Sequence, residues 1–119
     1  MLERFRWSVM ALAQPANIQK ELFPNFVAIA DELALNWEDA LQDIDKYKDL
    51  MSDEQISSIN DLDRYIESIS GPQNIEFWTN DALESRPEWD KIRKLSAVIA
   101  NKFMWPISPP PKSEDIYLQ

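Results

Sequence analysis

The chain has a single glycine, Gly71, in 119 residues, and this scarcity limits the folds open to it. Tight turns between β-strands depend on glycine, because glycine adopts positive φ angles without steric cost. The sequence also has few runs of β-branched residues, which strands favour. We therefore expect an all-α protein.

Apolar residues recur at helical spacing in the first part of the chain. They predict a helix from Leu2 to Ala13 that Pro15 closes, and a short second helix that ends at Pro24. The next helix is the clearest, and its apolar stripe consists of Phe26, Ala30, Leu33, Trp37, Ala40, Leu41 and Ile44. The polar segment 45–51 then reads as a loop.

The following helix has well-marked ends. Ser52 and Gln55 have the spacing of a capping box, and Gly71 with Pro72 provides a stop. Its expected inward face consists of Ile56, Ile59, Leu62, Ile66 and Ile69.

The last part of the chain predicts a connector, a short helical turn and a final helix. We expect Ile75, Phe77 and Trp78 to be buried in the connector, and Thr79 or Asn80 to cap the turn. Ser85 and Glu88 form a second potential capping box, before an apolar face made of Trp89, Ile92, Leu95, Ser96, Ile99 and Phe103. The expected architecture is a single-domain bundle of about four main helices plus short helical turns over residues 1–106. An extended proline-rich tail follows over residues 107–119.

Acidic residues are concentrated between Asp31 and Glu67. This window holds twelve acids and three bases, so its net charge of −9 equals that of the whole chain. The acids are Asp31, Glu32, Glu38, Asp39, Asp43, Asp45, Asp49, Asp53, Glu54, Asp61, Asp63 and Glu67. Such a charge repels phosphate backbones, so we do not expect direct binding of nucleic acid.

The composition removes most catalytic chemistry. Histidine and cysteine are both absent, so the usual general base, zinc ligands and nucleophile dyads are missing. The spacing of a calcium loop is met at positions one, three and twelve by Asp43, Asp45 and Glu54. However, position six is Lys48 instead of glycine, and position five is Tyr47, which has no carboxylate. We therefore read these acids as solvated and expect no enzyme, cofactor or metal site.

No apolar run is long enough to predict a membrane helix, and the N-terminus has no secretory signal pattern. These features indicate a soluble cytoplasmic protein that does not bind membranes.

The helix that contains Trp37 has an outer face on which Leu35 lies among carboxylates. Leu35 either packs under another helix or loop, or serves as an apolar anchor for a partner. The candidate partner-binding residues are Asp31, Leu35, Glu38, Asp39, Gln42, Asp45, Asp49, Asp53 and Asp61. Trp7, which lies off the main stripe of its helix, is a second candidate for an interface.

The small size, acidity and lack of catalytic groups resemble the immunity proteins of bacterial contact-dependent inhibition and other polymorphic toxin systems. Segments 5–9 and 31–35 are also similar to stretches of bacterial proteins. The resemblance implies neutralisation of a cognate toxin by tight, non-catalytic binding, and a basic, nuclease-like toxin would suit the acids. These proteins share no common signature, so the resemblance assigns no site residue. The alternative is a structural or scaffolding domain, as a monomer or a homo-oligomer, whose acidity serves solubility.

Overall fold

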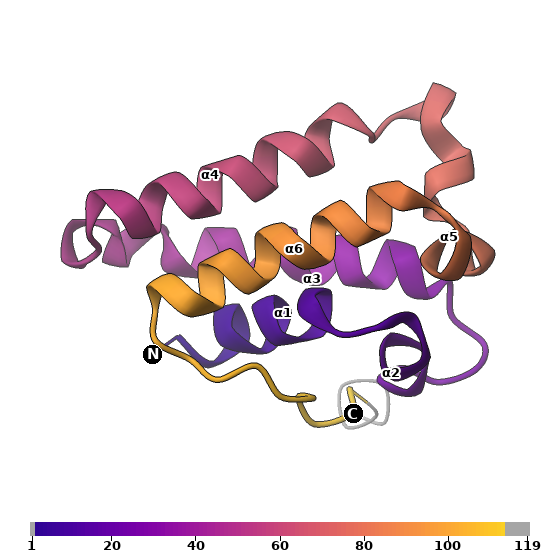
Figure 1. The fold of residues 1–119 in the computed structure, drawn as a ribbon, viewed down its shortest axis with the longest axis horizontal. Helices are drawn as coiled ribbons and strands as arrows, with labels where there is room; N and C mark the ends of the chain where they lie inside the picture. Colours follow the sequence, from indigo (N-terminus) through magenta and orange to yellow (C-terminus); the bar gives the residue numbers. More distant parts are fainter. Residues whose placement is uncertain (1, 114–119) are drawn as a thin grey trace.

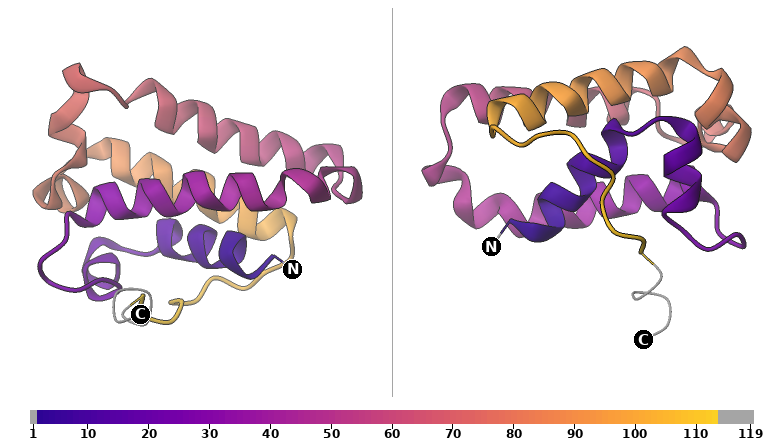
Figure 2. Two further views of the ribbon diagram at one scale, coloured as in Figure 1. Left: turned by 180° about the vertical axis from the view of Figure 1, so that it is seen from behind. Right: turned by 60° about the horizontal axis from the view of Figure 1, so that its bottom comes forward.

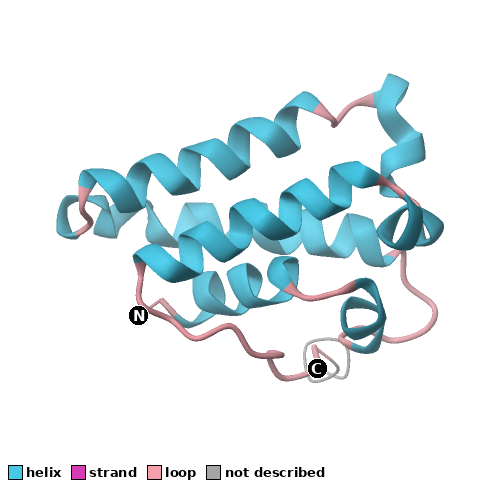
Figure 3. Cartoon of the chain, viewed as in Figure 1, coloured by secondary structure: helices cyan, strands magenta, loops and turns pink. Residues whose placement is uncertain are grey.

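The computed structural model describes residues 2–113, and this range contains helices and no strand (Figure 3). The helices are α1 (Glu3–Ala13), α2 (Ala16–Glu21), α3 (Ile29–Ile44), α4 (Asp53–Ser68), α5 (Asn80–Ser85) and α6 (Pro87–Lys102), with 3-10 helices η1 (Asp45–Leu50) and η2 (Pro72–Trp78). The expected all-α bundle of four main helices is confirmed.

α1 occupies an inner position in the bundle, as α6 does. It packs against α3 on one side and α6 on another, and α4 packs against α6 (Figure 1). The two views of Figure 2 show the same arrangement from behind and from below. Within the described chain, the backbones of α3 and α4 approach each other less closely than those of the α1–α3, α1–α6 and α4–α6 pairs, and side chains such as Trp37 span the space between them; we call this side of the bundle the open edge. The inner position explains why α1 buries Ser8, Met10 and Ala11 in addition to its expected apolar stripe.

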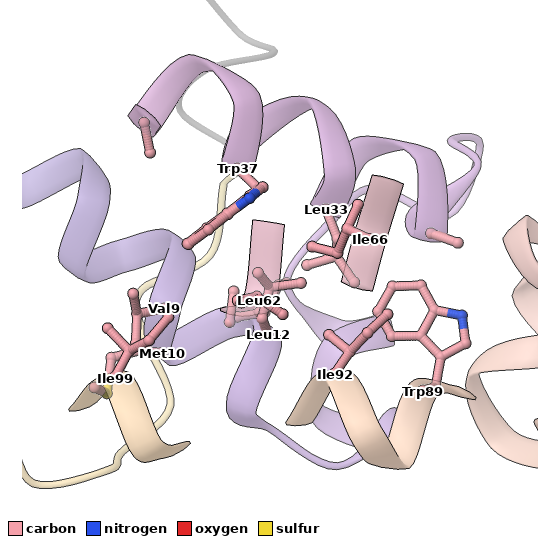
Figure 4. Close-up of a cluster of buried hydrophobic side chains, with 14 of the residues drawn as sticks. Val9, Met10, Leu12, Leu33, Trp37, Leu62, Ile66, Trp89, Ile92 and Ile99 are labelled. Atoms are coloured by element: carbon pink, nitrogen blue, oxygen red, sulfur yellow. The ribbon is translucent and has the colours of Figure 1, made fainter. Parts of the chain in front are cut away.

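Side chains from all four long helices meet in one core (Figure 4). Trp37 of α3 and Trp89 of α6 are fully buried, as the sequence predicts. Between the helices lie Val9, Leu12, Leu33, Leu62, Ile92 and Ile99. Each such side chain contributes about 1.5–3 kcal/mol to folding through removal of apolar surface from water.

Several helix ends agree with the sequence. The Ser52 capping box is present, since Ser52 Oγ accepts from Gln55 N at 3.1 Å and Gln55 Oε1 accepts from Ser52 N at 2.9 Å. Thr79 Oγ1 accepts from Ala82 N and so caps α5. Gly71 follows α4 with φ of +103°, a conformation in which a Cβ would be strained.

Two expected core residues are exposed instead. Phe26 is 81% exposed because Pro24 begins a turn and α3 starts only at Ile29. Ile75 is 69% exposed because it lies on the outside of η2, while Phe77 and Trp78 of the same connector are half-buried.

Two expected local structures are also wrong. The segment read as a loop forms η1, which continues directly from α3. Ser85 does not cap α6, because it is the last residue of α5 and its Oγ donates to Asp81 O. Arg86 occupies the N-cap position of α6 and forms an ion pair with Glu88.

Arg93 of α6 joins several elements through one guanidinium. Its Nε donates to Gln14 O, and its Nη2 donates to Gln19 Oε1 and Leu83 O, at 2.6–2.9 Å. Gln19 in turn donates to the last carbonyls of α1. Burial lowers the pKa of Arg93, an effect that Asp90 opposes. This network fixes α1, α2 and α5 to α6.

The proline-rich tail lies against the N-terminal half of the protein. Trp7 Nε1 donates to Pro111 O at 2.7 Å, and Ser113 donates to Leu22 O through both its N and its Oγ. Trp7 also packs edge-on against Phe23, so it is half-buried. The rest of the expected tail, residues 114–119, lies outside the described residues.

Candidate partner-binding surface

All nine residues assigned to partner binding from the sequence are exposed: Asp31, Leu35, Glu38, Asp39, Gln42, Asp45, Asp49, Asp53 and Asp61. Leu35 is 52% exposed, so it does not pack under another helix of the described chain. These residues do not all lie on one face, however. The contacts of α3 and α4 show which of them lie on the side where the two helices are neighbours.

The outer face of α3 has two sides. Asp43 forms an ion pair with Arg4 of α1, and Asp39 lies one turn before it on the same side. Asp31 lies on the other side, where it lines a pocket together with the turn that follows α4. Glu38 follows Asp31 by seven residues and Asp45 follows by fourteen. By helical geometry these three carboxylates form a row at intervals of about 10 Å along α3 and into η1, on the side of the outer face that is nearer to α4.

The acids of α4 divide in the same way. Asp63 Oδ1 accepts a hydrogen bond from Trp37 Nε1 of α3 at 3.2 Å, which places Asp63 on the α3 side. Glu67 lies one turn later on that side. Asp61 instead lies one turn before Tyr65, whose ring contacts Lys91 of α6.

Asp61, which the sequence assigns to the candidate surface, thus points away from α3, whereas Asp63 and Glu67, which it does not assign, lie on the α3 side. The open edge between the two helices is bordered by Asp31 and Glu38 from α3, by Asp45 from η1, and by Asp63 and Glu67 from α4; we call this set the acidic edge. The signal that could have found it is the seven-residue spacing of the α3 acids, combined with knowledge of which helix lies opposite.

Charge is unevenly distributed among the helices. α3 carries five acids and no base, and α4 carries five acids and one base. α6 carries four bases and two acids. Among the described residues, no ion pair joins a base to Asp31, Glu38, Asp39, Asp49, Asp53 or Asp61, whereas Asp45 pairs with Lys48 at 3.3 Å. The negative potential of the acidic edge is thus largely uncompensated.

A pocket of about 460 Å³ lies at one end of this edge. Asp31 and Ala34 line it from α3, and Gly71, Pro72, Ile75 and Trp78 line it from the turn after α4 and from η2. Asp31 is the one charged residue in this lining.

Hydrogen bonds hold both walls of the pocket. Trp78 Nε1 donates to Ile69 O at 2.8 Å, and Asn74 Nδ2 donates to Ser70 O at 2.8 Å. On the other wall, Asn80 Oδ1 accepts from Ile29 N and caps the start of α3. The pocket is therefore formed before any ligand arrives.

The residues that fit the calcium-loop spacing do not converge on one point. Asp43 pairs with Arg4, Asp45 with Lys48 and Glu54 with Lys102. In residues 2–113, no group of three or more acids is arranged to hold a metal ion.

Within the same range, none of the helices has the length and apolar character needed to cross a membrane.

Comparison with known proteins finds no match: no family model, curated protein or solved structure is matched by this chain.

Proposed function

We propose that this protein is a non-catalytic, immunity-type inhibitor that acts in the cytoplasm and neutralises a basic, nuclease-like toxin by tight binding. The observation that carries the proposal is the charge of α3, which has five acids, no base, and outward carboxylates at regular spacing. A face of this kind raises the rate of encounter with a cationic protein and disfavours other partners.

The acidic edge offers such a partner both orientation and affinity. Asp31 and Glu38 of α3 and Asp45 at the start of η1 present carboxylates about 10 Å apart, so a partner with similarly spaced bases docks in one register. Leu35 is exposed among these acids and provides an apolar contact that a partner can desolvate. In a nuclease, the bases that bind substrate phosphates would pair with these carboxylates instead.

The experiment is a pull-down from the source cell at low salt, with the product of the neighbouring gene included as bait. We expect recovery of one basic protein that salt elutes. Recovery should be lost with Glu38→Lys/Asp39→Lys, since both residues are exposed on α3 and their reversal leaves the core untouched.

A matched control separates local charge from total charge. Glu21→Lys/Glu84→Lys changes the net charge from −9 to −5, as the first double variant does, but on α2 and α5. It also breaks the ion pair between Lys20 and Glu84, a surface contact that contributes little to stability. This control should retain the partner. Equal loss in both variants would reduce the effect to net charge, and recovery of the protein alone would favour the scaffolding or homo-oligomeric alternative.

A further inference from the structure

The pocket between α3 and η2 combines apolar walls with one carboxylate, and this combination selects its occupant. Ile75 is 69% exposed and Pro72 is also exposed, so both offer apolar surface to a ligand. The Trp78 ring is fixed by its hydrogen bond to Ile69 O and by an edge-on contact with the Trp89 ring, whose centroid lies 5.5 Å from that of Trp78. Asp31 contributes the only charge.

We infer that this pocket receives an arginine side chain of the partner, an inference that rests on the proposed function. The three methylenes of arginine would pack against Ile75 and Pro72. Its planar guanidinium would lie near the Trp78 ring and pair with the Asp31 carboxylate.

Other occupants fit this chemistry less well. A purely apolar side chain would desolvate Asp31 without giving it a partner. An anion would meet Asp31 and no cation among the lining residues. A metal ion would meet a single carboxylate. Lysine is a more strongly hydrated cation than arginine and cannot stack a planar group on an aromatic ring.

The position of the pocket links it to the acidic edge. Asp31 is both the charged residue of the pocket and the first carboxylate of the row that continues to Glu38 and Asp45. An arginine in the pocket would therefore fix one end of a basic partner, while its other bases meet the row. The pocket adds a specific contact to a surface that otherwise acts mainly through charge.

The test is an NMR titration of the labelled full chain with N-acetyl-arginine amide and, separately, with N-acetyl-citrulline amide, which has the same shape without the charge. We expect arginine to produce saturable shifts at Asp31, Gly71, Ile75 and the Trp78 indole, with a dissociation constant of roughly millimolar size, as is usual for so small a ligand. Citrulline should bind at least fivefold more weakly. Absence of these shifts, or equal binding of the two compounds, would overturn the inference.

Two substitutions on the same helix provide the matched comparison. Asp31→Asn should weaken arginine binding at least threefold, and Asp39→Asn, on the α1 side of α3, should leave it within twofold. Ile75→Ala should also weaken binding, because it removes an apolar wall while keeping the charge. If Asp31→Asn and Asp39→Asn have the same effect, binding is diffuse and the pocket assignment is wrong.

The outcomes also separate this inference from the proposed function. If arginine leaves the pocket resonances unchanged while partner capture still depends on Glu38 and Asp39, the pocket inference fails and the inhibitor proposal stands. If arginine enters the pocket and reversal of Glu38 and Asp39 has no effect on capture, the inhibitor proposal fails and the pocket assignment stands.

Discussion

The α1–α6 side and the α3–α4 edge of this bundle are built on different principles. On the α1–α6 side, Arg93 satisfies backbone and side-chain acceptors from three other elements, and the tail covers Trp7. At the α3–α4 edge, the described helices are joined by a hydrogen bond from Trp37 to Asp63, and most outward carboxylates lack cations. All four long helices share one core, but the α1–α6 side is additionally held by polar contacts, whereas charge dominates the outer surface of α3 and α4.

The largest expected effect is the loss of the Arg93 network. Arg93→Met keeps an apolar stem but leaves Gln14 O, Leu83 O and Gln19 Oε1 without this donor. We expect the free energy of unfolding to fall by about 3 kcal/mol, measured by urea denaturation. Lys94→Ala, at an exposed position of the same helix, should change it by no more than about 0.5 kcal/mol. Equal effects of the two variants would show that the network contributes little.

A smaller loss is expected at the open edge. Asp63→Ala removes the acceptor of the Trp37 indole N–H and should lower the free energy of unfolding by about 1 kcal/mol. Asp63→Asn retains an oxygen acceptor and should recover most of this loss. Asp61→Ala, two residues away and exposed, is the control and should have almost no effect. If the Asp61 variant costs as much as the Asp63 variant, the hydrogen bond does not link the two helices as described.

The α1–α6 side also contains one unfavourable backbone conformation. Met104, which follows the C-cap residue Phe103 of α6, has a φ of 59°; here Trp105 N donates to Ala100 O and Met104 N donates to Asn101 O. Glycine suits this position better, because its φ is unrestricted and the Met104 side chain is 89% exposed. Met104→Gly should raise the free energy of unfolding by about 1 kcal/mol in the same urea assay. A decrease would mean that the Met104 side chain stabilises the fold through contacts.

The smallest effect tests the cost of concentrated charge. Asp39→Asn removes repulsion from Asp43 one turn away and should raise stability by about 0.3 kcal/mol at low salt. The gain should disappear at high salt, where such repulsion is screened. Glu88→Gln breaks the ion pair with Arg86 and should therefore lower the stability at low salt. Thermal melts of both variants at several ionic strengths provide the comparison. A gain that persists in high salt would contradict a charge-based origin.

Local signals in the sequence predicted the helices well, and tertiary placement accounts for what they missed. Ser52 and Gln55 define the start of α4 because a capping box is a local interaction. Phe26 matches the helical period of α3, yet the turn after Pro24 delays the helix and leaves it outside. Arg93 is an unremarkable charged residue in the sequence, because its partners come from α1, α2 and α5 and only folding brings them together.

The same limit applies to the candidate surface. Helical periodicity places Leu35 on the face of α3 opposite Trp37, but whether another element covers it depends on tertiary packing, and only the structure shows that Leu35 is exposed. Periodicity cannot tell which side of α4 lies toward α3, so Asp61 was included and Asp63 was not. The pocket involves η2, whose irregular sequence predicts neither the exposure of Ile75 nor its proximity to Asp31.

The central claim, that the acidic outer face of α3 docks a basic partner, is tested most directly by the association rate. The captured partner would be mixed with wild-type protein, with Glu38→Lys/Asp39→Lys and with Glu21→Lys/Glu84→Lys at about 20 mM and about 200 mM salt. We predict a wild-type rate that falls steeply with salt, a low-salt rate at least tenfold slower for the α3 variant, and a near wild-type rate for the control. An α3 variant with the rate and salt dependence of the wild type would contradict the claim.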